Sequence, residues 1–143
     1  MIIRRLTLED LAAAATLHGA SFDVGWSEDS LRSHFDNDLC LGVFAPDLAG
    51  FIVTRLAVDQ AEIITIAVAP ERRGHGIGQT LMEQALTHLH GNGVELLFLE
   101  VAEDNLSAIA LYKKCGFNPI GKRPAYYRRA GGRVAALTFR KDL

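Results

Sequence analysis

Three glycines that follow an apolar run are the residues of this sequence with the clearest chemical capacity. The run ends at Val68, and Gly74, Gly76 and Gly78 then occur at every second position just before an amphipathic segment. Glycine lets several backbone N–H groups converge on one ligand because no side chain stands in the way, and the N-terminus of a following helix adds partial positive charge. The arrangement predicts a binding site for a diphosphate.

Two common nucleotide-binding motifs do not fit this loop. A P-loop places a lysine and a hydroxyl residue directly after its last glycine, whereas Gly78 is followed by Gln79 and Thr80. A dinucleotide-binding fingerprint needs two residues between its last two glycines, and only Ile77 separates Gly76 from Gly78. Nucleotide hydrolysis and dinucleotide binding are therefore disfavoured. The three glycines alone would suit a mobile turn at the start of a helix equally well.

A second candidate is a carboxylate within an apolar strand. Glu100 shares one face of the expected strand 96–101 with Leu96 and Phe98, and burying an unpaired carboxylate there would be costly. Such a position is typical of a catalytic base. Two alternatives stay open, namely an ion pair with an arginine and exposure at the end of the strand. Glu62, on a neighbouring strand, could share or replace the role of base if Glu100 is ion-paired.

The cysteines and histidines indicate no further chemistry. Cys115 is a conceivable acyl carrier, but a lone cysteine at a helix end is more often a small buried hydrophobe. Cys40 lies too far from it for a zinc cluster or a disulfide framework, which favours a reducing compartment, the cytoplasm. No convergent metal-binding spacing is present in His18, His34, His88 and His90. We therefore expect no metal.

Hydrophobic periodicity and capping residues place these candidates on regular elements. We expect helices over about 7–19, 27–35, 76–90 and 105–115, and strands over 2–6, 39–44, 50–56, 62–68 and 96–101, near 120 and over 134–139. The strand 62–68, the glycine loop, the helix 76–90 and the strand 96–101 then form a β-loop-α-β unit. This unit places the glycines at a helix N-terminus.

Composition limits the architecture. The 143 residues fit one domain of ordinary size, residues 1–143, and with 49% hydrophobic and 22% charged residues the chain can bury a core. No segment approaches the roughly 20 apolar residues that span a bilayer, so we expect no membrane association.

Charge is distributed unevenly along the chain. The net charge is −2, but residues 113–143 hold 9 Lys and Arg against 1 acidic residue, whereas residues 1–112 hold 6 against 16. Such a basic tail attracts anions, for example a CoA phosphate, an acidic substrate or ribosomal RNA, and a solvated surface is the plainer interpretation. We expect no specific nucleic-acid partner.

Two segments together resemble the GNAT superfamily of N-acetyltransferases. The segment 73–78 reads Arg-Gly-His-Gly-Ile-Gly and matches the superfamily motif Arg/Gln-x-x-Gly-x-Gly/Ala. The segment 99–117 contains Leu-Glu-Val, Asn, Leu-Tyr and Gly-Phe in the order of the RimI-like branch, which acetylates N-terminal alanines of ribosomal proteins. The pairs Trp26-Ser27 and Tyr126-Tyr127 are also similar to that branch. The resemblance extends nearly from end to end.

The resemblance implies an α/β (α+β) architecture, the GNAT fold. Its central sheet is mixed, mostly antiparallel, has six or seven strands split around the acyl-CoA site, and carries about four helices. It also implies that acetyl-CoA is the co-substrate, with the pantetheine arm on strand backbone, the pyrophosphate on the glycine loop and an asparagine contacting the cofactor. The matching residues are Ile66, Ala67 and Val68 on the strand, Arg73, Gly74, His75, Gly76, Ile77 and Gly78 in the loop, and Asn105.

For catalysis, the resemblance implies direct transfer assisted by one base and one acid. Glu100 matches the glutamate that accepts the proton of the amine, directly or through water. Tyr112 matches the tyrosine that donates a proton to the CoA sulfur, and its alternative role is a core aromatic with a hydrogen-bonded hydroxyl.

On the acceptor side, the resemblance implies that Trp26, Tyr126 and Tyr127 bind a peptide. The expected partner is a peptide or protein N-terminus, with a ribosomal protein as acceptor. The chain departs from the family at Gly132-Arg-Val-Ala-Ala136, where the family has an acidic residue. A GNAT enzyme for a small amine, amino acid or lysine side chain remains an alternative. The second alternative is a non-catalytic acyl-CoA-binding module. Such a module would be expected to lack the base or the acid, whereas this chain has both Glu100 and Tyr112.

Overall fold

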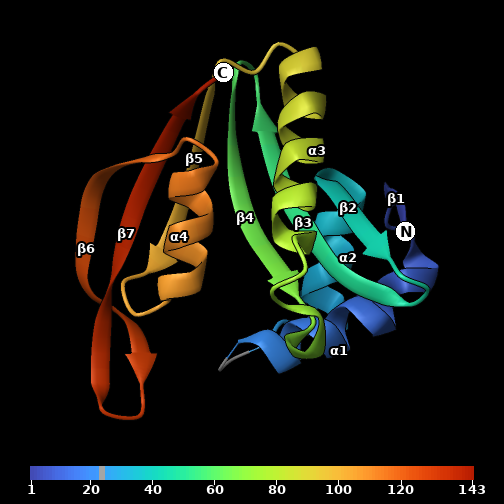
Figure 1. The fold of residues 1–143 in the computed structure, drawn as a ribbon, viewed down its shortest axis with the longest axis horizontal. Coiled ribbons are helices and arrows are strands. Elements are labelled where there is room, and N and C mark those ends of the chain that lie inside the picture. The colour runs from blue at the N-terminus through green and yellow to red at the C-terminus, as the bar shows by residue number, and fades with distance from the viewer. Residues whose placement is uncertain (23–24) are drawn as a thin grey trace.

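The computed structural model describes residues 1–22 and 25–143, which form seven strands, four α-helices and two short 3-10 helices (Figure 1). The strands are β1 (Ile2–Arg5), β2 (Leu39–Phe44), β3 (Leu48–Ala57), β4 (Gln60–Val68), β5 (Leu96–Ala102), β6 (Asn118–Arg129) and β7 (Gly132–Asp142). The helices are η1 (Leu8–Asp10), α1 (Leu11–Ser21), α2 (Glu28–Asn37), η2 (Pro70–Arg72), α3 (Ile77–Gly91) and α4 (Leu106–Lys114).

All seven strands of the described residues belong to one sheet, in the order β1-β2-β3-β4-β5-β7-β6. Neighbouring strands are antiparallel except β4 and β5, which are parallel and joined through α3. The predicted fold class, a mixed and mostly antiparallel sheet with four helices, is thus confirmed, and so is the β-loop-α-β unit around the glycines.

The sheet is split between its two parallel strands. Pairing of β4 with β5 covers only Gln60 to Ile63 against Leu96 to Leu99. Ile64 is then an extra residue in β4, because Thr54 of β3 pairs with Ile63 and Val53 pairs with Thr65. A bulge of this kind bends its strand, and beyond it β4 and β5 diverge (Figure 1). The bulge therefore opens the sheet where the two strands stop pairing.

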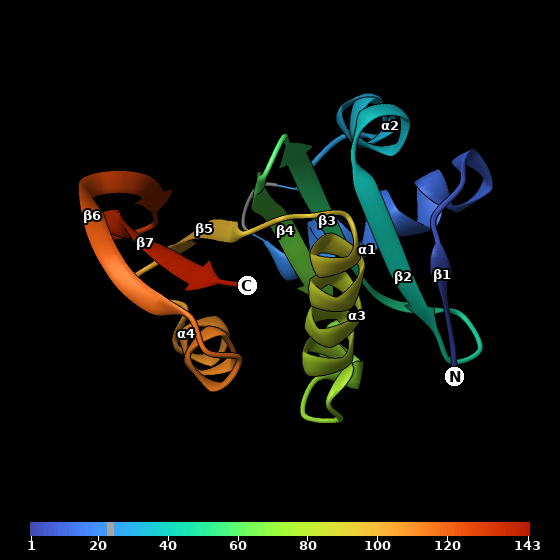
Figure 2. The ribbon, with the colours of Figure 1, turned by 90° about the horizontal axis from the view of Figure 1, so that it is seen from above.

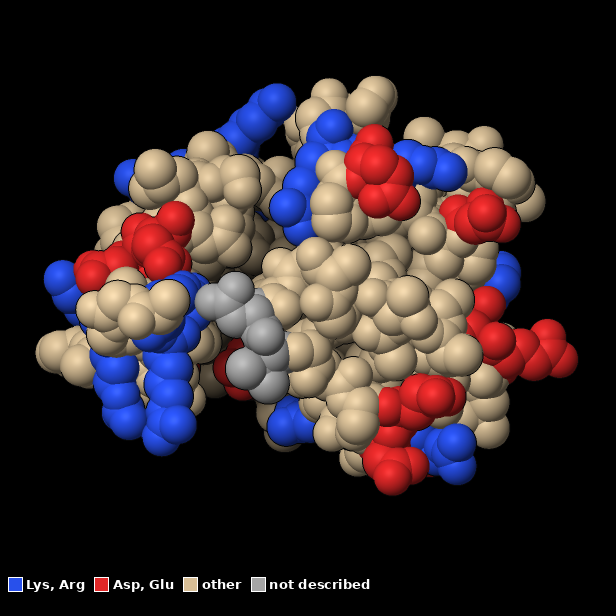
Figure 3. Space-filling view, turned by 90° about the horizontal axis from the view of Figure 1, so that it is seen from below, with Lys and Arg blue, Asp and Glu red and all other residues tan. Residues whose placement is uncertain are grey.

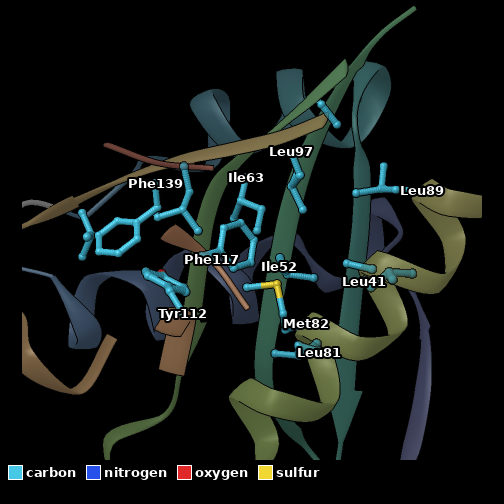
Figure 4. Close-up of a cluster of buried hydrophobic side chains, with 14 of the residues drawn as sticks. Leu41, Ile52, Ile63, Leu81, Met82, Leu89, Leu97, Tyr112, Phe117 and Phe139 are labelled. Carbon is cyan, nitrogen blue, oxygen red and sulfur yellow. The ribbon is translucent and has the colours of Figure 1, made fainter. Parts of the chain in front are cut away.

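Helices cover both faces of the sheet (Figure 2). Helices α3 and α4 share one face, where α3 residues such as Leu81 and Met82 pack with Ile52 and Ile63, and Phe117 and Phe139 pack beside α4 (Figure 4). Helices α1 and α2 bury a second cluster around Leu31 and Phe51 on the opposite face. Burying each such side chain contributes about 1.5–3 kcal/mol of transfer free energy, so both layers hold the split sheet in place.

Three elements differ from the sequence prediction. The helix expected over 7–19 begins with the 3-10 turn η1, in which the Thr7 N–H donates to the Asp10 carboxylate at 2.8 Å. The two C-terminal strands are much longer than expected. Strand β6 contains Pro119, Gly121 and Pro124, which resemble turn residues, but a strand at the sheet edge tolerates them because its outer backbone groups need no partner.

No helix among the described residues is both long enough and apolar enough to cross a membrane.

Candidate active site

A cavity of about 320 Å³ lies where the sheet is split, between β4, the start of α3 and α4. Of the predicted cofactor residues, its lining includes Ile66, Ala67, Val68, Arg73, Gly74, Gly76, Ile77, Gly78 and Asn105, together with the predicted acid Tyr112. The chain thus brings residues from three separate segments to one hollow. His75 lies outside this lining, and its Nδ1 is turned toward the carbonyl oxygen of Arg73 at 3.0 Å.

Strand β4 presents backbone groups to the cavity. Just after β4, the Ala69 N–H donates to the Ala49 carbonyl of β3 at 2.8 Å. Backbone N–H and C=O groups alternate in direction along an antiparallel strand. Those of Ala67 therefore also point toward β3, whereas those of Ile66 and Val68 point toward the split. The Val68 carbonyl accepts hydrogen bonds there from the Arg73 Nε (3.2 Å) and the Ser21 hydroxyl (3.3 Å). The backbone of Ile66 and the N–H of Val68 therefore offer groups that an extended amide ligand would pair with.

The glycine loop leads directly into α3. Gly74 and Gly76 have φ of 79° and 78°, the left-handed region that other residues enter only with strain. Gly76 caps α3, and the first helical bond runs from the Thr80 N–H to its carbonyl at 3.0 Å. The N–H groups of residues 77–79 consequently have no acceptor within the helix. They form, with the helix dipole, a site suited to a diphosphate.

Two contacts fix the position of this loop. The Arg72 guanidinium donates to the Ala45 carbonyl in the β2–β3 turn at 2.6 Å. A Cβ atom on Gly78 would lie 3.1 Å from the Leu111 side chain, so glycine there allows α3 and α4 to approach closely. The loop is thus anchored to both sides of the split sheet.

Helix α4 carries two of the predicted residues. Asn105 is its N-cap, and its side-chain oxygen accepts from the Ala108 N–H at 3.3 Å while the residue also lines the cavity. Tyr112 is 5% exposed and its ring lies 6.0 Å from that of Phe117. Burial raises the pKa of the Tyr112 phenol well above its usual value. The phenol therefore keeps its proton at neutral pH and can act as a donor.

Glu100 lies on β5 with 22% of its side chain exposed. One of its oxygens, Oε1, is 3.0 Å from Nη2 of Arg123, so the ion pair left open by the sequence is present. The other, Oε2, is buried and has no hydrogen-bond partner among the described residues. Glu62, the other candidate base, is exposed on β4 opposite Arg55, in the stretch that still pairs with β5.

Trp26 follows α1 and belongs to a stack of aromatic rings. Its ring lies 4.6 Å from that of His18 and 4.8 Å from that of His34, and Phe22 stacks on the other side of His18 at 4.3 Å. His18 is 2% exposed, and burial lowers its pKa to about 4. It approaches the Thr65 hydroxyl at 3.3 Å and accepts from the Trp26 backbone N–H at 3.2 Å. His18 therefore ties the segment after α1 to the bulged strand β4.

Tyr126 and Tyr127 lie near the end of β6, where their rings meet edge to face at 5.0 Å. Tyr126 is 50% exposed. Burial raises the pKa of Tyr127, and the charge of Glu100 raises it further, so Tyr127 lies within electrostatic reach of Glu100. The Arg129 guanidinium lies 5.7 Å from the Tyr127 ring and holds the Asp104 carboxylate at 2.8 and 3.1 Å.

Sequence reasoning missed several lining residues, which are Ser21, Phe22, Arg72, Gln79, Ser107, Ala108, Leu111 and Lys114. Gln79 could have been found from its place in the first turn after the glycines. Ser21 and Phe22 had no sequence signal, because only the fold brings the end of α1 to β4. Among residues 1–22 and 25–143, no group of three or more His, Cys, Asp or Glu side chains is arranged to hold a metal ion.

Comparison with known proteins gives consistent matches. A profile of the acetyltransferase (GNAT) family matches residues 11–117. The [ribosomal protein bS18]-alanine N-acetyltransferase of Salmonella typhimurium is 36% identical over 137 residues, which cover 92% of this chain and 90% of that protein. The crystal structure of the ribosomal-protein alanine N-acetyltransferase from Escherichia coli has a TM-score of 0.93 and 32% identity, covering 99% of this chain and 92% of that one. Arabidopsis thaliana NAA60 in complex with acetyl-CoA shares the fold, with a TM-score of 0.89 at 17% identity and coverage of 99% and 98%.

Proposed function

The chain belongs to the GNAT family of acetyltransferases, and we propose from this premise that it transfers the acetyl group of acetyl-CoA to the N-terminal alanine of a ribosomal protein. The observation that carries the proposal is the cavity in the split sheet, which combines an open strand edge, a glycine loop and a buried tyrosine. The relatives that act on ribosomal protein bS18 match most of this chain and support the acceptor. The acceptor also favours the cytoplasm as the place of the reaction.

Acetyl-CoA binding is proposed to use three parts of the cavity. The backbone of Ile66 and Val68 pairs with the amides of the pantetheine arm, as a neighbouring strand would. The free N–H groups of residues 77–79 and the glycine loop hold the pyrophosphate. Asn105 adds a contact from the start of α4. These residues come from one sheet, its covering helices and the loops that join them, which supports residues 1–143 as a single catalytic domain.

Transfer is proposed to proceed by direct attack of the amine on the thioester. The nitrogen forms a bond to the carbonyl carbon while the bond from that carbon to sulfur breaks. Glu100 receives the proton released by the amine, directly or through a water molecule, and its buried Oε2 has no competing partner among the described residues. Tyr112 donates its proton to the departing sulfur, which leaves as a thiol. No covalent enzyme intermediate is required.

A peptide panel tests this function. Acetyl-CoA is supplied with a peptide that begins with alanine, with an Nα-blocked peptide that contains lysine, and with polyamines and free amino acids, and the released thiol is measured. We expect thiol release with the alanine peptide, and mass spectrometry should place the acetyl group on its α-amine. Transfer confined to small amines or lysine side chains would overturn the proposed acceptor. Thiol release with none of them would indicate an acyl-CoA-binding module.

A further inference from the structure

The two oxygens of Glu100 are in different situations. Oε1 is 3.0 Å from Nη2 of Arg123, whereas Oε2 is buried without a hydrogen-bond partner among the described residues. The side chain of Arg123 is 58% exposed, and its guanidinium also lies 5.2 Å from the centroid of the Tyr126 ring. Arg123 thus stands between the carboxylate and the tyrosines of the proposed acceptor side.

The other acids near β6 have cations of their own. Glu103 is 3.3 Å from Lys122, and Asp104 is held by Arg129 at 2.8 Å. Lys and Arg side chains gather on the side of the molecule where the β6–β7 turn lies (Figure 3). Among the described residues, each carboxylate in this neighbourhood is paired with a cation, and removing the charge of Arg123 would leave Glu100 without its ion-pair partner.

The pKa of Tyr127 responds to the charges of both Glu100 and Arg123. Its pKa is raised first by burial and then by Glu100, and it is lowered by Arg129 and Arg123. Both members of the ion pair therefore act on the same phenol at the proposed acceptor side. A positively charged amine at this position would experience attraction to Glu100 and repulsion from Arg123 together.

Amines differ in the fraction that is uncharged at a given pH. An α-amino group has an ordinary pKa of about 7.7–8.0 and a lysine side chain one of about 10.4. At pH 7.5 roughly a third of α-amines but only about one lysine amine in a thousand carries no charge. A site that does not attract ammonium groups binds mainly neutral amines. It therefore favours α-amines, because a much larger fraction of them is neutral.

We propose that Arg123 is a specificity residue that keeps ammonium groups from Glu100 and so selects neutral N-terminal α-amines over lysine side chains. This inference rests on the proposed function, because it names the feature that separates its acceptor from other amines. Arg123 acts by its charge, so a lysine at the same position should preserve the selection and an uncharged glutamine should abolish it.

A permanently charged probe tests the role of Arg123 without turnover. The probe is an alanine peptide with a trimethylated N-terminus, and its neutral counterpart carries a tert-butyl group in place of the trimethylammonium group. Affinities for both are measured by calorimetry on the protein with CoA present. For Arg123→Gln we expect at least about tenfold tighter binding of the charged probe, with the neutral probe unchanged within about twofold. Arg123→Lys should keep the preference of the unmodified protein.

Lys122→Gln is the matched control. Lys122 is the preceding residue, its side chain is also 58% exposed, and it forms an ion pair of similar length with Glu103. Arg128→Gln removes one exposed positive charge that has no ion-pair partner among the described residues. Neither control should alter the ratio of the two affinities by more than about twofold. Equal tightening in these variants would show a general charge effect and overturn the proposal.

Turnover provides the second readout. The kcat/KM for an Nα-blocked lysine peptide, relative to that for the alanine peptide, should rise at least about tenfold in Arg123→Gln. An unchanged ratio, together with unchanged binding of the charged probe, would overturn the role of Arg123. Failure of the unmodified protein to acetylate any peptide would instead reject the proposed function, and the probe affinities would still report on Arg123.

Discussion

Tyr112 belongs to the hydrophobic core and also lines the cavity. Its ring packs near those of Phe117 and Phe139, at centroid distances of 6.0 and 6.4 Å, and the residue also borders the split between β4 and β5. Packing immobilises the ring, and the burial that raises the phenol pKa keeps the proton available for donation. The two roles that the sequence left as alternatives are therefore compatible.

Removing the hydroxyl of Tyr112 should separate chemistry from stability. Tyr112→Phe keeps the ring and its packing, so we expect kcat to fall about 10²-fold or more while the melting temperature changes little. Glu100→Gln should lower kcat to a similar extent because the amide cannot accept the proton. Steady-state kinetics and thermal unfolding measure both effects. A kcat for Tyr112→Phe close to that of the unmodified protein would contradict the acid role.

His18 should make stability depend on pH. Its folded pKa of about 4 is below the ordinary value of 6.5, so between these values the unfolded chain binds more protons than the folded chain. The free energy of unfolding should therefore fall as the pH drops from 6.5 toward 4, by up to about 1.4 kcal/mol per pH unit from this group.

Urea unfolding at several pH values measures this dependence. His18→Gln should flatten the slope between pH 6.5 and 4, even if it lowers stability throughout. His90→Gln, at an exposed position of α3, should leave the slope as it is. Equal slopes in the unmodified protein and in His18→Gln would refute the assignment.

Glycines at the two ends of α3 should respond oppositely to the same substitution. Gly76 has a φ of 78°, and an alanine in this conformation costs about 1–2 kcal/mol. Gly91 ends α3 in helical conformation with open space around it, so Gly91→Ala should stabilise the protein by about 0.5–1 kcal/mol. Denaturant unfolding compares the two variants, and calorimetry with acetyl-CoA should show weaker binding for Gly76→Ala alone. Weaker binding in both variants would argue against a local role of the loop.

The elements differ in how far the sequence predicts them. Helix α3 was located closely because its apolar positions recur at helical spacing and glycines flank it. Strand β6 was not, because its prolines and arginines lack an alternating pattern. The bulge at Ile64 had no signal either, since one extra residue in an apolar run changes no composition. The irregular elements, which open the sheet and form the proposed acceptor side, were therefore the least predictable ones.

At the scale of the whole molecule, the sheet has two parts, β1 to β4 and β5 to β7. They are joined by only four residue pairs between β4 and β5. A ligand in the cavity contacts both parts, because the lining comes from β4 and α3 on one side and from α4 on the other. Ligands that bind only the folded state raise its stability by mass action, about 2.7 kcal/mol at a concentration of 100 times Kd.

Acetyl-CoA should therefore raise the melting temperature and protect selected amides. Hydrogen exchange of the Ile66 and Val68 amides, which face the split, should slow when acetyl-CoA is added. The Ala67 amide, which faces β3, is the internal control and should change much less. Uniform slowing of all three amides would indicate general stabilisation rather than pairing along β4.

The overall arrangement was predictable from motifs, but the pairing of distant charges was not. The glycine loop, Asn105 and Tyr112 meet at one cavity, as their resemblance to the family implied. The ion pair between Glu100 and Arg123 depends on how β6 folds back beside β7, and nothing in the sequence selects Arg123 among the arginines of the tail. Side-chain partners across long loops follow only from the fold.

The hydrogen bonds that reach the Val68 carbonyl bear on whether the open edge of β4 can pair with another chain. An unpaired strand edge is a template on which another chain can add a strand, and splitting the sheet exposes such an edge along β4. Ser21 and Arg73 both donate to Val68 there, so the last carbonyl of the edge is occupied by the protein itself. We therefore expect these two side chains to hinder the addition of a foreign strand at this end of β4 before any ligand binds.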